Sequence, residues 1–263
     1  MPRLIFIVFF FLISTSASAQ TWEIGAFLGS SGYMGDINPI RPQKFTDFAH
    51  GAQFKRNFDG YWSAKLAYMS GKIQGDDAKS TNPYQRDRNL NFYSKVSELS
   101  MQVEFNFFKY LAGDMYSYGN KRFSPYLFTG VATLSFEPMT EYVGDEVSLR
   151  LAETEAVAYK NRAISVPYGL GVKYNIGGNF NIIGEIGYRT AFTDYLDDIS
   201  GRYPDYGAIP LKTPISQELS DRSFFPKIGI PGTQRGDFRP HDTYMFAGIT
   251  LSFTFVPIRC PTF

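Results

Sequence analysis

The sequence contains very little cysteine and histidine. Its 263 residues include one cysteine, Cys260, and two histidines, His50 and His241. A single cysteine excludes an internal disulfide framework and any zinc site built from several cysteines. We expect Cys260 to be a free or packed thiol, although an odd cysteine in an oxidising compartment also permits an intermolecular bond.

An excess of charge and a long apolar run are also missing. The formal net charge is +1 at pH 7, which indicates no electrostatic surface for nucleic acid. The apolar run Leu4–Ile13 is about half of the roughly 20 residues that a membrane-spanning helix needs. With Arg3 before it and Ala17-Ser18-Ala19 after it, this run predicts a signal peptide over residues 1–19. We therefore expect an exported chain in which residues 20–263 form one domain.

The clearest pattern that is present is a two-residue alternation over residues 163–192. Apolar side chains recur at every second position in 164–176 and at most such positions in 180–192, which predicts two β-strands. Gly177-Gly178 between them predicts a two-residue hairpin turn with positive φ angles. One face of this hairpin is apolar, and the other carries Lys173, Glu185 and Arg189.

Six other segments alternate in the same way, so we expect eight strands. The six segments are residues 22–32, 47–58, 62–68, 93–107, 123–136 and 243–255. The apolar side of segment 123–136 carries Tyr126, Phe128, Ala132, Leu134 and Phe136. The connections alternate between short turns, such as Asp59-Gly60, and long polar loops, of which 194–242 is the longest. Residues 137–162 form another long insertion, with a short helix expected around 147–158.

These features predict an all-β fold, an eight-stranded antiparallel transmembrane β-barrel with long extracellular loops. Outer-membrane barrels have an even strand number, short periplasmic turns, longer external loops and both termini in the periplasm. We expect the apolar strand faces to contact outer-membrane lipid, and aromatic residues near strand ends to form interface girdles. The expected girdle residues are Trp22, Tyr61, Trp62, Tyr93, Tyr174, Tyr188 and Tyr244. A secreted β-sandwich is the alternative, but it leaves the alternation of loop lengths unexplained.

Five segments, taken in order along the chain, resemble a known family. They are Tyr33–Pro39, Ser70–Asp77, Glu98–Phe108, Ser124–Phe128 and Thr193–Gly201. Together they are similar to the PorG-type outer-membrane β-barrel family of Bacteroidetes. The resemblance implies a non-catalytic structural or docking component of the type IX protein secretion system. It also implies association with the periplasmic ring formed by the PorK lipoprotein and PorN.

With both termini in the periplasm, the short turn and the C-terminal tail are the segments expected to touch such a partner. The residues concerned are Gly177, Gly178, Arg259, Cys260 and Phe263. Inside the barrel we expect a cluster of paired charges, because eight strands enclose a space just wide enough for side chains. The cluster comprises Lys55, Lys65, Glu98, Glu104, Lys173, Glu185 and Arg189. A barrel filled in this way cannot pass a folded protein.

Three other functional hypotheses arise from the loops. Asp194, Asp197, Asp198 and Asp205 could supply oxygen ligands to Ca²⁺, but they lack EF-hand spacing, and loop aspartates commonly cap turns. His241 and Asp242, with Ser220 and Ser223 upstream, could form a hydrolase site, yet no nucleophile motif surrounds either serine. The long loops could also make the protein a surface adhesion or binding barrel. Arg235-Gly236-Asp237 matches the tripeptide read by integrins, a match that arises easily by chance. We predict no enzyme activity, no metal and no cofactor.

Overall fold

The computed structural model describes residues 21–38, 45–113, 118–205, 207, 214–224 and 226–256. The predicted signal peptide, 1–19, and the tail residues Arg259, Cys260 and Phe263 lie outside these ranges. The elements, in chain order, are β1 (Thr21–Met34), β2 (Phe45–Asn57), β3 (Trp62–Asp76), η1 (Asp77–Lys79), α2 (Pro83–Arg88), β4 (Asn91–Asn106), β5 (Phe123–Tyr142), β6 (Asp145–Ser148), α3 (Leu149–Ala152), β7 (Arg162–Gly177), β8 (Phe180–Ala191), α4 (Pro214–Ser220) and β9 (Thr243–Phe255). No helix in the described part of the chain is long and apolar enough to cross a membrane.

Eight of the strands form a closed antiparallel barrel, which confirms the predicted fold. Each strand pairs with the next one around the barrel, and β1 also pairs with β9. The barrel closes where β4 pairs with β5 along residues 93–106 and 126–139. The ninth strand, β6, pairs only with the far end of β5, so it extends one hairpin beyond the barrel. Closure leaves no unpaired sheet edge among the eight strands.

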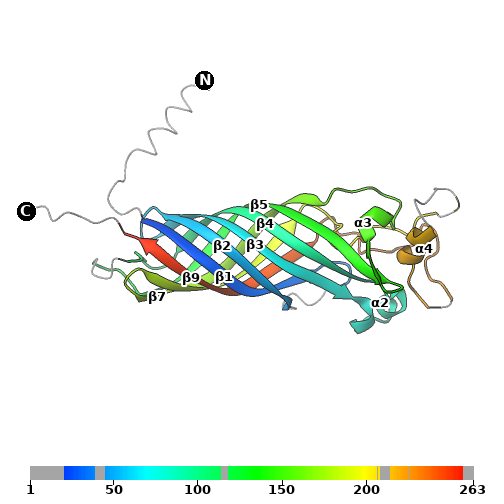
Figure 1. Ribbon diagram of the computed structural model, residues 1–263, viewed down its shortest axis with the longest axis horizontal. Coiled ribbons are helices and arrows are strands. Elements are labelled where there is room, and N and C mark those ends of the chain that lie inside the picture. The colour runs from blue at the N-terminus through cyan, green and yellow to red at the C-terminus, as the bar shows by residue number, and fades with distance from the viewer. Residues whose placement is uncertain are drawn as a thin grey trace, which may run out of the picture.

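The two ends of the barrel differ, as Figure 1 shows. The short connections lie at one end, which also holds the start of β1 and the end of β9. The long loops and the helices α2, α3 and α4 lie at the opposite end. We call these the terminal end and the capped end. The helix predicted around 147–158 is shorter than expected, because α3 ends at Ala152 and the next residue, Glu153, has a positive φ.

The hairpin between β7 and β8 departs from the predicted turn. Gly177 still pairs with Phe180, so the two turn residues are Gly178 and Asn179. Only Gly178 has a positive φ, at 52°, and a register shift between Asn175 and Gly177 accommodates the extra residue. The Asn175 side chain donates a hydrogen bond of 2.9 Å to the Gly178 carbonyl, which holds the turn closed.

The outer face of the barrel is apolar. Leu28, Met101 and Val131, at outward positions of three strands, are 60%, 64% and 60% exposed. Aromatic rings lie at the terminal end of the same face, including Trp22 stacked on Phe54 with ring centroids 4.8 Å apart. A water-soluble protein rarely exposes so continuous an apolar surface, whereas a lipid-facing barrel requires one. The secreted β-sandwich alternative is therefore wrong.

The barrel interior is charged in its middle and apolar next to the capped end. The apolar part includes Met69, Phe92, Leu134, Phe136 and Phe246, each at most 2% exposed. The apolar side of segment 123–136 consequently faces inward and not toward lipid. The reason is that a narrow barrel must fill its own interior, and the space below the cap is filled by apolar side chains.

Tyr244 corrects a second prediction. It was expected in an interface girdle, but it is fully buried inside the barrel. Its hydroxyl group donates a hydrogen bond of 2.6 Å to Glu98. A tyrosine near a strand end thus belongs to the girdle only when its position in the alternation points outward.

Candidate functional site

Charged side chains from six strands fill the middle of the barrel. The group consists of Glu23, Lys55, Lys65, Glu98, Glu104, Lys173, Glu185 and Arg189. Each is at most 8% exposed, and four cations face four carboxylates, so the formal charges cancel. Seven of these residues were expected from the sequence. Glu23 was missed, although it occupies the polar side of the alternating segment 22–32.

Glu104 is the centre of this network. Its Oε2 atom lies 2.6 Å from Lys173 Nζ and 3.1 Å from Lys55 Nζ. Its Oε1 atom lies 3.2 Å from Lys65 Nζ, and Lys65 lies 2.7 Å from Glu185 Oε2. One carboxylate thus pairs with three lysines from three different strands, and Glu185 and Glu23 supply further negative charge to Lys65 and Lys55. Buried ions are tolerated only when they are paired in this way.

A second ion pair lies nearer the capped end. Arg189 Nε is 3.2 Å from Glu98 Oε2, and the guanidinium group lies over the Phe246 ring at 4.9 Å. With the Glu104 group, this pair occupies the interior with mutually compensated charge. The arrangement suits a packed interior and not an aqueous channel.

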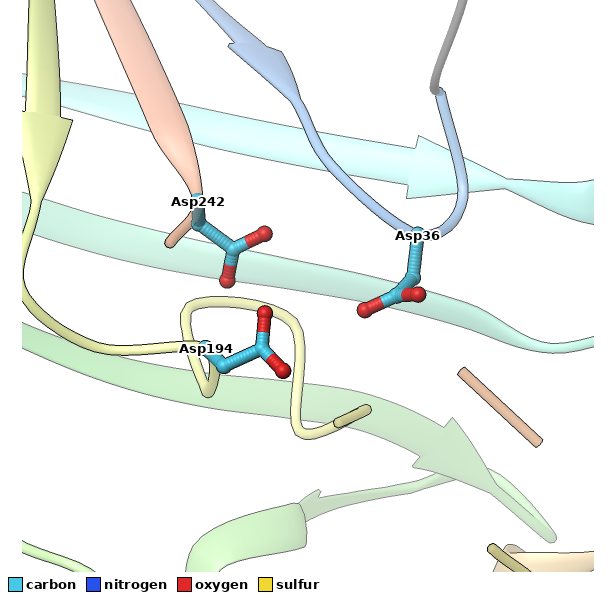
Figure 2. A group of neighbouring side chains, drawn as sticks. All are labelled: Asp36, Asp194 and Asp242. Atoms are coloured by element: carbon cyan, nitrogen blue, oxygen red, sulfur yellow. The ribbon is translucent and has the colours of Figure 1, made fainter. Parts of the chain in front are cut away.

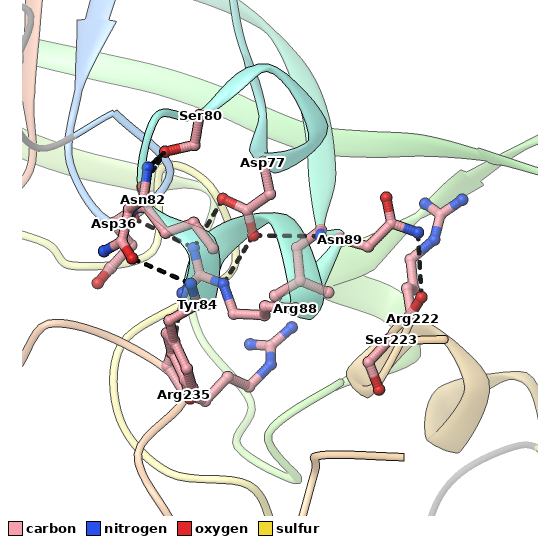
Figure 3. Close-up of polar contacts among 12 residues, drawn as sticks. Asp36, Asp77, Ser80, Asn82, Tyr84, Arg88, Asn89, Arg222, Ser223 and Arg235 are labelled. Atoms are coloured by element: carbon pink, nitrogen blue, oxygen red, sulfur yellow. Dashed lines mark hydrogen bonds and ion pairs between the residues drawn. The ribbon is translucent and has the colours of Figure 1, made fainter. Parts of the chain in front are cut away.

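Above the strands, four loops join through buried polar side chains, and Figure 3 shows the contacts among three of them. The Arg88 guanidinium donates two hydrogen bonds, of 2.7 and 3.0 Å, to Asp77 in its own loop. It also donates to the carbonyl of Asp36 after β1, at 3.2 Å, and to the carbonyl of Arg235 before β9, at 2.5 Å. One arginine therefore joins three loops. These three loops and the loop that carries α3 together form what we call the cap.

Arg235 joins the fourth loop to the others. Its Nη1 atom donates hydrogen bonds of 2.8 Å to Glu155 Oε1, in the loop between α3 and β7, and to the carbonyl of Asp198. Arg235 is 2% exposed, so the Arg235-Gly236-Asp237 tripeptide presents no accessible arginine. Its role here is structural.

Three aspartates meet beneath the cap, at the mouth of the barrel (Figure 2). Asp36 follows β1, Asp194 follows β8, and Asp242 precedes β9. One carboxylate oxygen from each lies within 4.8 Å of the others. Gly35 lies against this group, because a Cβ atom there would collide with the Asp242 carboxylate and the Tyr33 hydroxyl. Among the residues that the structure describes, these three carboxylates are the group that could hold a metal ion.

The close approach of like charges in a buried place alters their ionisation. Burial, with smaller contributions from Asp242 and Asp237, raises the pKa of the Asp36 carboxyl to about 8. Burial also raises the pKa of Asp194 to about 6. For Asp242 the pKa rises well above its usual range, through burial and then through Asp197. The cluster is therefore costly to hold as three bare carboxylates.

The predicted acidic set is only partly brought together. Asp198 accepts hydrogen bonds from Thr154 and Tyr159, and Asp205 is exposed. Asp197 accepts a hydrogen bond from Tyr33. Sequence analysis missed Asp36 and Asp242 as ligands because they lie 206 positions apart along the chain. The pairing of the first and last strands would have revealed them, since Met34 lies opposite Thr243.

The proposed hydrolase residues do not form a catalytic arrangement. The His241 ring is exposed and contacts Phe192 edge to face, with centroids 5.1 Å apart. Ser220 and Ser223 are buried, and the Ser223 hydroxyl donates to Asp221. Among the described residues, neither serine is hydrogen bonded to His241.

The fold and interior define a class of protein, an eight-stranded antiparallel barrel with an apolar outer face and a side-chain-filled lumen. Within that class, the chain belongs to the family described as "Domain of unknown function (DUF6089)", which matches residues 2–212. None of the curated proteins matches this sequence.

Several solved structures resemble the chain distantly. Neisserial surface protein A shares 11% identity, with 91% of this chain and 99% of that chain covered and a TM-score of 0.41. A major outer membrane protein from Thermus thermophilus shares 11% identity, with 90% and 100% covered and a TM-score of 0.44. The N-terminal β-barrel domain of Pseudomonas aeruginosa OprF shares 11% identity, with 89% and 97% covered and a TM-score of 0.39. Likenesses this distant carry no argument about function.

Proposed function

We propose that this protein is a non-catalytic outer-membrane barrel that acts as a structural and docking component of the type IX secretion system. The observation that carries the proposal is the lumen filled by paired charges around Glu104. Such a barrel offers surfaces to partners and not a passage to substrates. The apolar outer face supports insertion of the barrel into the outer membrane. The assignment to type IX secretion rests on the five segments that resemble the PorG-type family.

The orientation forms part of the proposal. The terminal end, with its short turns, faces the periplasm, and the cap faces the outside. Gly177, the last residue of β7, and Gly178, in the turn that follows, are both exposed, and we propose that they contact periplasmic ring subunits of the PorK and PorN type. Arg259, Cys260 and Phe263 belong to the same proposed contact by their position in the sequence.

A secretion assay tests the role, and cross-linking tests the docking. Deleting the gene should block secretion of type IX cargo, and the intact gene should restore it. A photo-reactive phenylalanine analogue at Tyr118, which is 97% exposed in the connection between β4 and β5, should cross-link to ring subunits. The matched control is the same analogue at Val143, which is 86% exposed beyond the opposite end. Normal secretion after deletion, or ring cross-links from Val143 alone, would contradict the proposal.

The cap favours a second candidate function, binding at the cell surface. Its loops are joined by Arg88 and Arg235, so they present a defined surface. Apolar side chains are exposed on it, including Leu151 at 61% and Phe224 at 74%. Preorganised surfaces with exposed apolar anchors suit partner binding. Retention of ligand or cell binding after Leu151→Ser and Phe224→Ser together would count against this second function.

A further inference from the structure

We propose that Asp36, Asp194 and Asp242 bind one hard divalent cation of the Ca²⁺ type at the mouth of the barrel. Their carboxylate oxygens lie within 4.8 Å of one another, and they come from three separate strand ends. Figure 2 shows all three carboxylates turned toward a common space. The site is independent of any role in secretion.

An unpartnered oxygen is the second observation that points to a ligand. Asp36 is 3% exposed, and its Oδ1 atom accepts a hydrogen bond from the Asp237 backbone N–H. Its buried Oδ2 atom has no hydrogen-bond partner among the described residues. Buried polar atoms almost always have a partner, so a buried carboxyl oxygen left without one calls for a ligand.

Asp242 provides a similar oxygen. Its Oδ2 atom accepts a hydrogen bond of 3.0 Å from the Leu196 N–H. Its Oδ1 atom lies 3.5 Å from the Tyr33 hydroxyl, but the single proton of that hydroxyl is directed to Asp197. Asp242 is 1% exposed, so bulk water supplies little compensation. Asp36 and Asp242 thus each have one buried carboxyl oxygen that receives no strong hydrogen bond.

The neighbouring cationic side chains are already engaged. Arg88 binds Asp77 and two backbone carbonyls, and Arg235 binds Glu155, the Asp198 carbonyl and the Ser220 carbonyl. Within the described ranges, no lysine or arginine forms an ion pair with the three aspartates. A bound cation would supply the missing positive charge.

The donor set selects the chemistry of the ion. All three groups are carboxylates, and hard cations such as Ca²⁺ and Mg²⁺ prefer oxygen ligands. Ca²⁺ accepts six to eight oxygens in flexible geometry, so carboxylates from three strand ends suit it, with water completing the shell. Bound there, the ion would join the loop after β1 to both ends of the loop between β8 and β9.

Thermal unfolding of the purified mature protein in detergent micelles, with EDTA or with added Ca²⁺ or Mg²⁺, tests the proposal. About 5 mM Ca²⁺ exceeds the dissociation constants of roughly 0.1–1 mM seen in extracellular calcium modules. We expect Ca²⁺ to raise the melting temperature by about 2–4 °C or more relative to EDTA. A smaller rise with Mg²⁺ would indicate selectivity for Ca²⁺.

Asp36→Asn and Asp242→Asn are the test variants, and Asp87→Asn is the matched control because Asp87 is exposed in the same cap. Each test variant should abolish the Ca²⁺-dependent rise while keeping or increasing the melting temperature in EDTA, because it replaces a carboxyl group whose ionised form is costly in this buried place. Asp87→Asn should behave as the wild type does. Tyrosine-sensitised Tb³⁺ luminescence, displaced by Ca²⁺, should appear in the wild type and be lost in Asp36→Asn. An unchanged melting temperature in the wild type, or a Ca²⁺ response retained by both test variants, would overturn the proposal.

Discussion

Glu104 illustrates how a single residue holds the interior of the barrel. The surrounding lysines lie on β2, β3 and β7, and their charges would repel one another without the carboxylate between them. The desolvation cost of a buried ion is several kcal/mol, and only close partners offset it. The network is therefore a stability element whose parts depend on one another.

Replacing Glu104 with glutamine should destabilise the barrel strongly. The change preserves shape but leaves three buried lysines without their shared anion, so we expect a loss of about 3–5 kcal/mol in unfolding free energy. Urea unfolding in detergent micelles measures it. Glu141→Gln, at an exposed position of β5, is the control and should change stability by less than about 0.5 kcal/mol. Equal effects of the two changes would show that the lumen charges are not coupled.

Because the pKa of the Asp198 carboxyl is raised, we expect the stability of the protein to depend on pH. Burial raises its pKa to about 6, even though Arg235, Thr154 and Tyr159 oppose the rise. A carboxyl group whose folded pKa exceeds its unfolded value of about 3.9 stabilises the fold below that value. This contribution is lost as the pH rises through about 6.

Asp198→Asn should therefore be more stable than the wild type at pH 7, by up to about 3 kcal/mol, and should lose that advantage near pH 4. Asparagine suits the position because the φ of residue 198 is 70°, in the left-handed region. Unfolding curves of both proteins between pH 4 and pH 8 provide the measurement. Asp205→Asn, at an exposed site, is the control. Parallel pH profiles for wild type and Asp198→Asn would refute the argument.

At the scale of the element, each barrel strand must satisfy two environments at once. In β4, inward Glu98, Ser100 and Gln102 alternate with outward Leu99 and Met101. This alternation sets the register, because a slip of one residue would turn every charge toward lipid.

Replacing Leu99 with arginine tests whether the outward side of β4 contacts lipid. Leu99 is 52% exposed near the middle of β4, where an arginine facing the bilayer midplane costs about 2–4 kcal/mol. Leu151→Arg is the control, since Leu151 is 61% exposed in α3 of the cap. Folding titrations into lipid vesicles should show a large loss for the first variant and a small one for the second. Similar losses for both would argue against a lipid-facing β4.

For the molecule as a whole, closure and a filled lumen predict two properties together. The closed hydrogen-bonded barrel should resist detergent until heated, so unheated protein should migrate differently from heated protein on a gel. The packed interior should give no steady conductance in planar lipid bilayers. Stable open channels in the purified protein would contradict the account of the lumen, whereas a single migration form would contradict the account of the barrel.

Much of the fold follows from local patterns, and less of the candidate site does. The eight strands and the short turn after Asn57 were predictable, since alternation and turn residues are local signals. The turn at Gly178 and Asn179 was not, because the register of β7 against β8 decides it. The length of α3 was not predicted either, because the chain turns to a positive φ at Glu153 directly after Ala152. The inward orientation of Phe128 and Phe136 also depends on what fills the space under the cap.

The sequence by itself determined the number of barrel strands, the alternation that gives each strand two faces, and the alternation of short and long connections, because each is encoded in neighbouring residues. Only the tertiary structure decided that Glu23 joins the lumen network and that Arg88 and Arg235 join the loops. It alone brought Asp36 beside Asp242. The physical reason is closure of the barrel. Pairing the first strand with the last brings residues that are far apart in the sequence to the same end of the barrel, and no local sequence pattern predicts that they are close in space.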